Sequence, residues 1–148
     1  GALRRRGLRG AAARRLTVAK ADILIVEDHP TMREAMRLIL EHEGFEIREA
    51  PDGATALSMV RDRHPDLMFL DLNIPGASGA DVLTELKSEP STTDIRVIIV
   101  TATGEEGREY VLSLGADEYF TKPFSPTALL RTVERVLEGP SEPSSAGS

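Results

Sequence analysis

The stretch Phe69-Leu70-Asp71-Leu72-Asn73-Ile74-Pro75-Gly76-Ala77-Ser78-Gly79 (FLDLNIPGASG) places one acid at the end of an apolar run. A Pro-Gly turn and a second glycine follow that acid directly. A carboxylate in this position either caps the next helix or is placed there to be chemically modified. The choice depends on which other polar side chains the fold brings to the same place.

Short apolar blocks occur on both sides of this stretch. Residues 23–26 (ILIV), 67–70 (LMFL) and 97–100 (VIIV) are continuous apolar runs, as is typical of strands buried on both faces. Residues 45–49 and 118–120 are weaker strand candidates, which we expect nearer the edges of the sheet. The sequence thus predicts five strands.

Helical spacing of apolar residues separates these strands, over residues 32–40, 54–60, 82–86 and 129–137. Gly44 is the expected stop of the first helix, and Ser125 and Pro126 give the last one an N-cap and a first-turn proline. Segment 105–114 is the weakest helix, because Gly107 lowers its propensity. The order βαβαβαβαβα predicts an α/β fold, a doubly wound parallel sheet with helices on both faces.

Length, charge and composition limit the classes of function that the chain could have. The 148 residues predict one folded domain, and the absence of cysteine excludes disulfides and thiolate metal sites. No apolar run is long enough to cross a bilayer, so we expect a cytoplasmic protein without a membrane partner. The first 21 residues carry +7, so the overall charge of −6 leaves −13 on residues 22–148. That acidic body makes a poor nucleic-acid surface.

The predicted domain organisation has three parts. Residues 1–21 form a basic N-terminal leader that we expect to be flexible, the alternative being a basic arm for an acidic partner. Residues 22–138 form the folded domain. Residues 139–148 (GPSEPSSAGS) have the composition of a linker or tail.

Polar side chains follow four of the predicted strands. Glu27 and Asp28 follow the first strand, Asp71 the third and Thr101 the fourth, and Lys122 comes shortly after the fifth. Each of these alone is an ordinary helix cap or surface residue. In a parallel sheet, however, the carboxyl ends of the strands share one edge, where binding sites lie. We therefore expect three acids, one hydroxyl and one amine to converge.

Four motifs now resemble the receiver domains of two-component response regulators, the CheY-like family. They are 26–28 (VED), 71–76 (DLNIPG), 100–102 (VTA) and 115–124 (GADEYFTKPF), and the resemblance covers about residues 22–138. It implies a flavodoxin-like (βα)5 fold with strand order 2-1-3-4-5. It also implies that Asp71 is phosphorylated by a sensor histidine kinase or a phosphotransfer protein.

The resemblance further implies a Mg²⁺ site. Asp28 and Asp71 would contribute oxygens directly, Glu27 would act through water, and the main-chain carbonyl of Asn73 would complete the protein ligands. Elementary electrostatics agrees, because converging carboxylates repel one another unless a hard cation lies between them. Glu27 departs from the family pattern, in which Asp is commoner. His29, His42 and His64 lack metal-ligand spacing and are expected to be ordinary surface or loop residues.

The remaining matched positions concern the phosphoryl group and its readout. Lys122 would neutralise phosphoryl oxygens, Thr101 would hydrogen-bond one of them, and Lys122-Pro123 matches a cis peptide position. The small Ala102 should leave the phosphoryl group accessible. Tyr119 occupies the position of the switch aromatic, and we expect it to turn inward on phosphorylation; the alternative is an edge aromatic that merely packs. The altered surface would be formed by 105–114, 118–120 and 126–137, where an output domain, an effector or a second copy binds.

Rival functions remain at this point. An aspartyl-phosphate phosphatase of the haloacid-dehalogenase type needs a second acid two residues after its nucleophile, and this chain has Asn73 there. A receiver used only as a binding scaffold is disfavoured by the presence of all five key side chains. The leading prediction is therefore a phosphorylation switch and not a metabolic enzyme. The sequence leaves open a stand-alone regulator or a fragment of a longer transcriptional regulator or hybrid kinase.

Overall fold

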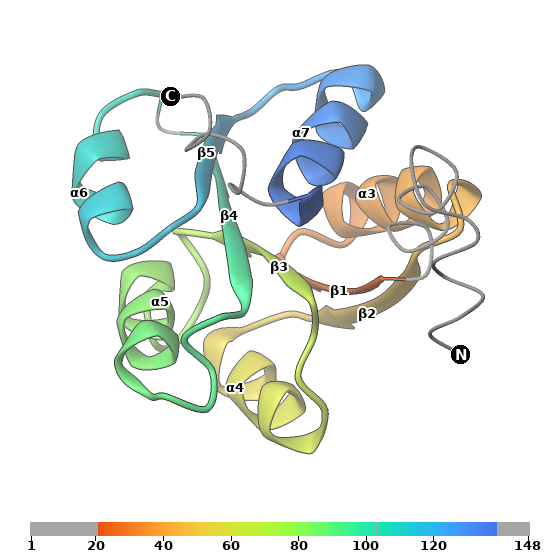
Figure 1. Ribbon diagram of the computed structural model, residues 1–148. Helices are drawn as coiled ribbons and strands as arrows, with labels where there is room; N and C mark the ends of the chain where they lie inside the picture. Colours follow the sequence, from red (N-terminus) through yellow and green to blue (C-terminus); the bar gives the residue numbers. More distant parts are fainter. Residues whose placement is uncertain (1–20, 103, 139–148) are drawn as a thin grey trace, which may run out of the picture.

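The computed structural model describes residues 21–102 and 104–138; the tail, and the leader apart from Ala21, lie outside these ranges. One five-stranded sheet forms the centre, with the order β2-β1-β3-β4-β5 and all neighbours parallel (Figure 1). The strands are β1 (Asp22–Val26), β2 (Glu46–Ala50), β3 (Leu67–Asp71), β4 (Arg96–Thr101) and β5 (Glu118–Thr121). The predicted α/β fold and strand order are confirmed, and the two weaker strands lie at the edges.

Five helices cover the sheet in the described part of the chain. They are α3 (Pro30–His42), α4 (Gly53–Asp62), α5 (Gly79–Ser88), α6 (Arg108–Ser113) and α7 (Pro126–Glu138). Helices α3 and α7 pack on one face, while α4, α5 and α6 pack on the other (Figure 1). Successive side chains of a strand point to opposite faces of the sheet. Ile23 and Ile25 therefore join one core cluster, and Leu24 and Val26 join the other. Because helices cover both faces, a polar site has room only at the ends of the strands or along the two outer strands.

Local sequence signals set most helix ends. The Ser125 Oγ accepts a hydrogen bond of 3.1 Å from the Ala128 N–H, so the predicted N-cap of α7 is confirmed. Helix α3 stops at His42, two residues before Gly44. The expected helix 105–114 is shorter than predicted: α6 begins only at Arg108, because Gly107 adopts a left-handed φ of 91°. Among the described residues, no helix is long and apolar enough to cross a membrane.

Candidate functional site

Three of the predicted site residues meet at the carboxyl edge of the sheet. The Lys122 Nζ donates hydrogen bonds of 3.0 Å to the Glu27 Oε1 and of 3.0 Å to the Asp71 Oδ2. Glu27 follows β1, Asp71 ends β3, and Lys122 follows β5. The parallel sheet thus brings together groups that are 95 and 51 positions apart in the chain. This convergence is the one that the strand-end pattern predicts.

These three groups are sequestered from water. Glu27 is 2% exposed and Asp71 4% exposed, and the Lys122 side chain is only 14% exposed. Burial disfavours the charged amine, but its hydrogen bonds and attraction to Asp71 and Glu27 outweigh this and raise the pKa of Lys122 above its usual value. Lys122 is therefore a fixed cation at neutral pH. It stabilises two carboxylates that would be costly to bury unpaired.

Asp28 adds a third carboxylate that Lys122 does not contact in the described structure. Its Oδ1 is buried and has no hydrogen-bond partner among the residues described, and it lies 3.4 Å from the His29 Nδ1. A buried acceptor without a partner costs free energy unless a ligand satisfies it. Three carboxylates and one ammonium also leave two uncompensated negative charges. The donor set therefore fits a hard divalent cation such as Mg²⁺.

Each oxygen of the Asp71 carboxylate accepts a hydrogen bond, and the two bonds orient the group. Its Oδ1 accepts a hydrogen bond of 3.0 Å from the Asn73 N–H, and its Oδ2 accepts the bond from Lys122. The Asn73 side chain is exposed. These contacts fix the carboxylate oxygens relative to the loop, while the expected ligand role of the Asn73 carbonyl stays a prediction.

The two glycines after Asp71 do different things. Gly76 has a φ of 79° and no atom within 4 Å of the site of a Cβ, as expected for an open turn. Gly79 has no such open space around it. A Cβ at Gly79 would lie 2.5 Å from the Asp71 carbonyl oxygen and 2.7 Å from the Leu72 Cα. Gly79 instead lets the start of α5 pack against the backbone of the acid.

Thr101 ends β4 and is fully buried. Its carbonyl oxygen accepts a hydrogen bond of 2.8 Å from the Lys122 N–H, so the end of β4 positions the backbone that carries the amine. The next residue, Ala102, is exposed. The Lys122-Pro123 peptide bond is cis, as the resemblance predicts.

Tyr119 lies inward in this structure, without any phosphoryl group. It is 3% exposed, its hydroxyl donates a hydrogen bond of 2.5 Å to the Gly104 carbonyl, and the Arg108 guanidinium lies 5.1 Å from its ring centre. The expectation that the ring turns inward only on phosphorylation therefore needs correction. These contacts with the loop and with α6 stabilise the inward position, and the pattern of the sequence gave no sign of Arg108.

His29 is a surface residue, as the sequence predicts, but its contacts with the acids were not predicted. Its Nδ1 lies 3.2 Å from the Glu27 Oε2, and its main-chain N–H donates to the same oxygen over 3.2 Å. Together Glu27, Asp28 and His29 place three possible ligand atoms within 4.8 Å of one another. The available signal was position alone, because His29 directly follows two of the expected site acids.

A separate hollow lies at the opposite edge of the sheet. It has a volume of about 340 Å³, and Asp66, Asp94 and Arg96 are among its lining residues. Asp66 precedes β3, Asp94 precedes β4 and Arg96 begins β4, whereas the acids of the site end or follow their strands. The hollow is therefore not part of the carboxylate site.

Comparisons with known proteins agree with this geometry. The family model described as the response regulator receiver domain matches residues 23–134. The phosphate regulon transcriptional regulatory protein PhoB of Escherichia coli (strain K12) is 43% identical over 116 residues, which are 78% of this chain and 51% of PhoB. The sensory transduction protein RegX3 of Mycolicibacterium smegmatis is 38% identical over 127 residues, which are 85% of this chain and 54% of RegX3.

Solved structures give the same fold. A putative response regulator from Chloroflexus aurantiacus superposes with a TM-score of 0.77 at 30% identity, covering 81% of this chain and 99% of that one. NtrX from Brucella abortus also gives a TM-score of 0.77, at 32% identity, covering 86% of this chain but 29% of its own. The chain spans about half the length of the curated relatives it matches.

Proposed function

Since this chain belongs to the family of response regulator receiver domains, we propose that it is a phosphorylation switch in which Asp71 accepts the phosphoryl group. The donor is the phosphohistidine of a sensor histidine kinase or a phosphotransfer protein in the cytoplasm. The observation that carries the proposal is the pair of 3.0 Å hydrogen bonds from the Lys122 Nζ to Asp71 and Glu27. A buried carboxylate held against a fixed cation is suited to nucleophilic attack on an anionic phosphoryl group.

The metal in this proposal is Mg²⁺. Asp28, Asp71 and the Asn73 main-chain carbonyl would hold it directly and Glu27 through water, and when bound it would offset charge between nucleophile and phosphoryl oxygens. Two features support this assignment: the Asp28 Oδ1 has no hydrogen-bond partner among the described residues, and the Glu27 Oε1 is engaged by Lys122. An indirect role for Glu27 agrees with that engagement.

The chain's own residues carry the transfer. An Asp71 oxygen forms the new bond to phosphorus while the P–N bond to the donor histidine breaks, and the imidazole leaves with the electron pair. Lys122 would first pair with the carboxylate and then offset the negative charge on the phosphoryl oxygens. The Thr101 hydroxyl would donate a hydrogen bond to one of those oxygens. The exposed, small Ala102 leaves room for the donor histidine.

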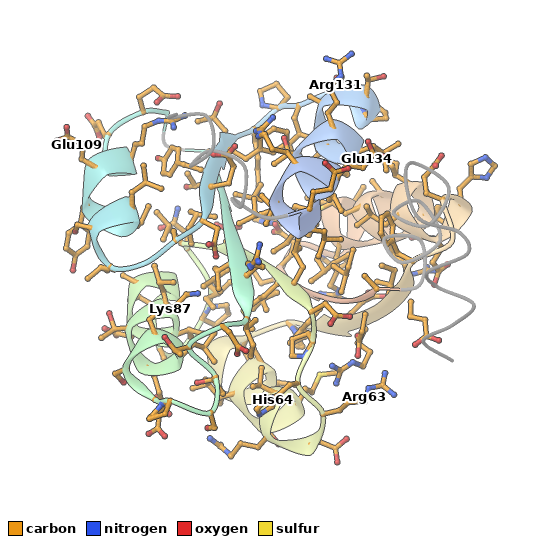
Figure 2. All side chains as sticks on the ribbon, viewed as in Figure 1. Arg63, His64, Lys87, Glu109, Arg131 and Glu134 are labelled. Atoms are coloured by element: carbon orange, nitrogen blue, oxygen red, sulfur yellow. The ribbon has the colours of Figure 1, made fainter. Side chains whose placement is uncertain are left out.

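The output would be a change in the surface formed by α6, β5 and α7, the region between Glu105 and Arg131. Because Tyr119 is already inward, phosphorylation would stabilise an arrangement that is populated beforehand, and not create a new one. Glu109 of α6 and Arg131 and Glu134 of α7 point away from the sheet (Figure 2). An effector, an output domain or a second copy of the chain would bind these exposed side chains.

Turnover of an external substrate is not part of the proposal. The position two residues after Asp71, where a phosphatase of the haloacid-dehalogenase type needs a general acid, holds the amide Asn73. Hydrolysis of the chain's own acyl phosphate would be its one hydrolytic reaction. The match to about half of PhoB and RegX3 favours, as the second candidate, a receiver that belongs to a longer transcriptional regulator.

The test is phosphorylation with acetyl phosphate and Mg²⁺, followed by intact mass. We expect the wild type to gain one phosphate, and Asp71→Asn to gain none. Asp81→Asn, which alters an exposed aspartate in the first turn of α5, is the control and should label as the wild type does. Undiminished labelling of Asp71→Asn would overturn the assignment.

The readout is tested separately by NMR with beryllofluoride, a mimic of the phosphoryl group. We expect the largest remote shift changes between Glu105 and Arg131, and their loss in Thr101→Ala. Changes centred on α3 and α4, or persisting in Thr101→Ala, would disprove the coupling while leaving the phosphorylation of Asp71 intact.

A further inference from the structure

We infer that His29 is an additional ligand of the cation site and gives it an affinity for borderline transition ions, such as Co²⁺ and Zn²⁺, that oxygen ligands alone would not supply. The inference rests on the metal site in the proposed function. It concerns which ions the site selects, because the oxygens already account for Mg²⁺.

The first argument is the spacing of the candidate ligand atoms. The His29 Nδ1 lies 3.2 Å from the Glu27 Oε2 and 3.4 Å from the Asp28 Oδ1. For metal–ligand bonds of about 2.1 Å, neighbouring ligands lie about 3.0 Å apart in an octahedron and about 3.4 Å apart in a tetrahedron. The spacing between the His29 Nδ1 and the Asp28 Oδ1 is therefore that of adjacent corners of one coordination shell. The Glu27 Oε2, which would reach the ion through water, lies within hydrogen-bond distance of the same ring nitrogen.

The second argument is which atoms remain available. The Glu27 Oε1 is taken by Lys122, but the Oε2 faces His29. The Asp28 Oδ1 is buried and forms no hydrogen bond with the described residues. The His29 side chain is 72% exposed, so water can reach the remaining corners of the shell. The main-chain N–H of His29 also donates to the Glu27 Oε2, which fixes the turn that carries the ring.

The third argument is the chemistry of imidazole. Carboxylate, carbonyl and water oxygens suit Mg²⁺, whereas imidazole nitrogen suits Co²⁺, Ni²⁺, Cu²⁺ and Zn²⁺. Every oxygen site already binds Co²⁺ somewhat more tightly than Mg²⁺. The contribution of His29 is therefore measured as the decrease in the preference for Co²⁺ over Mg²⁺ when the ring is removed.

The experiment measures Mg²⁺ and Co²⁺ dissociation constants by calorimetry for the wild type, His29→Ala and His29→Glu. The matched control is His42→Ala, an exposed histidine in the last turn of α3. We expect His29→Ala to weaken Co²⁺ binding at least about tenfold and to change Mg²⁺ binding less than about twofold. His29→Glu should bind Mg²⁺ at least as tightly as the wild type and still lose the preference for Co²⁺.

A second readout is direct. The chain has three histidines, and Zn²⁺ should shift the ring Nδ1 resonance of His29 in a long-range ¹H–¹⁵N spectrum, while Mg²⁺ should not. If His29→Ala leaves the ratio of the two dissociation constants unchanged, or if the Nδ1 resonance does not shift, the inference is wrong. If Mg²⁺ binding does not depend on Asp28, the metal site of the proposed function fails instead.

Discussion

At the scale of single residues, the site holds buried charges that must be compensated by one another. Glu27 and Asp71 are nearly inaccessible to water, and each is bonded to one amine that is itself mostly buried. Removing one partner from such a buried network is costly because it leaves an uncompensated charge. Lys122 therefore has a structural role apart from the chemical role proposed for it, and the structural role can be measured by its dependence on pH.

Alkaline pH should weaken the fold through Lys122. Its pKa is raised above the usual 10.5, so its contribution to stability is complete below that pH and is lost as the pH rises through the higher folded-state value. Urea unfolding in EDTA should show wild type more stable than Lys122→Met at about pH 8, with the difference shrinking above about pH 10.5. A difference that stays constant across this range would mean that the ion pairs contribute nothing.

Arg108 should hold Tyr119 inward. Its guanidinium lies 5.1 Å from the ring centre, and a cation over an aromatic ring contributes about 0.5–2 kcal/mol. We expect Arg108→Ala to broaden or shift the Tyr119 ring resonances in NMR and to raise the outward population. Arg135→Ala, which removes the partner of Glu118 and not of the ring, should leave those resonances in place. Identical spectra for wild type and Arg108→Ala would contradict this role.

At the scale of elements, the site depends on close packing between a helix and a strand end. Helix α5 begins at Gly79, whose N–H donates a hydrogen bond of 3.1 Å to the Leu72 carbonyl. The start of α5 thus lies against the backbone of Leu72 and of Asp71. Helix α6 is the opposite case, because it has six residues and begins late, after Gly107. Short helices gain little from their own hydrogen bonds, so the stability of α6 depends mainly on its packing against the rest of the domain.

Gly79→Ala should destabilise the domain. The added Cβ would lie 2.5 Å from the Asp71 carbonyl oxygen, and backbone must move to relieve such overpacking, at a cost of about 1–3 kcal/mol. Gly107→Ala is the comparison, because its Cβ would meet no atom within 4 Å and the cost is the strain of a positive φ alone, about 1–2 kcal/mol. Urea unfolding measures both. We expect slower labelling of Asp71 by acetyl phosphate in Gly79→Ala only, and equal labelling of both variants would contradict the packing argument.

At the scale of the whole molecule, the carboxyl edge of the sheet concentrates negative charge that folding must tolerate. Bringing Glu27, Asp28 and Asp71 together opposes folding, and any cation that binds the folded state alone adds stability through mass action. The size of that effect depends only on the free cation concentration relative to its dissociation constant.

Mg²⁺ should therefore raise the melting temperature. At a free concentration one hundred times the dissociation constant, linkage gives about 2.7 kcal/mol. The gain should disappear in Asp28→Ala and persist in Asp62→Ala, which removes an exposed acid at the end of α4. Without metal, Asp28→Ala should melt no lower than wild type, since it relieves repulsion. A melting temperature insensitive to millimolar Mg²⁺ would count against the site.

The sequence predicts the fold almost completely, because the signals involved are local. Buried parallel strands appear as apolar blocks such as 67–70, and caps such as Ser125 are read from residue type. The meeting of Asp71 and Lys122 follows from the topology alone. The side-chain contacts of His29 with Glu27 and of Arg108 with Tyr119 do not, because they depend on rotamers and loop geometry. The late start of α6 was missed for a related reason, since a propensity scale penalises Gly107 without telling which φ it adopts.

The inward Tyr119 also gives the molecule an optical property. The chain has two tyrosines and no tryptophan, so no stronger emitter masks tyrosine fluorescence. Tyr110 is 59% exposed, whereas the Tyr119 hydroxyl is bonded to a backbone carbonyl beneath an arginine. In a Tyr110→Phe background, Tyr119 would be the sole tyrosine emitter. A change in the contact of that hydroxyl with the loop before α6 would then be readable in real time without a dye, an isotope or an added residue.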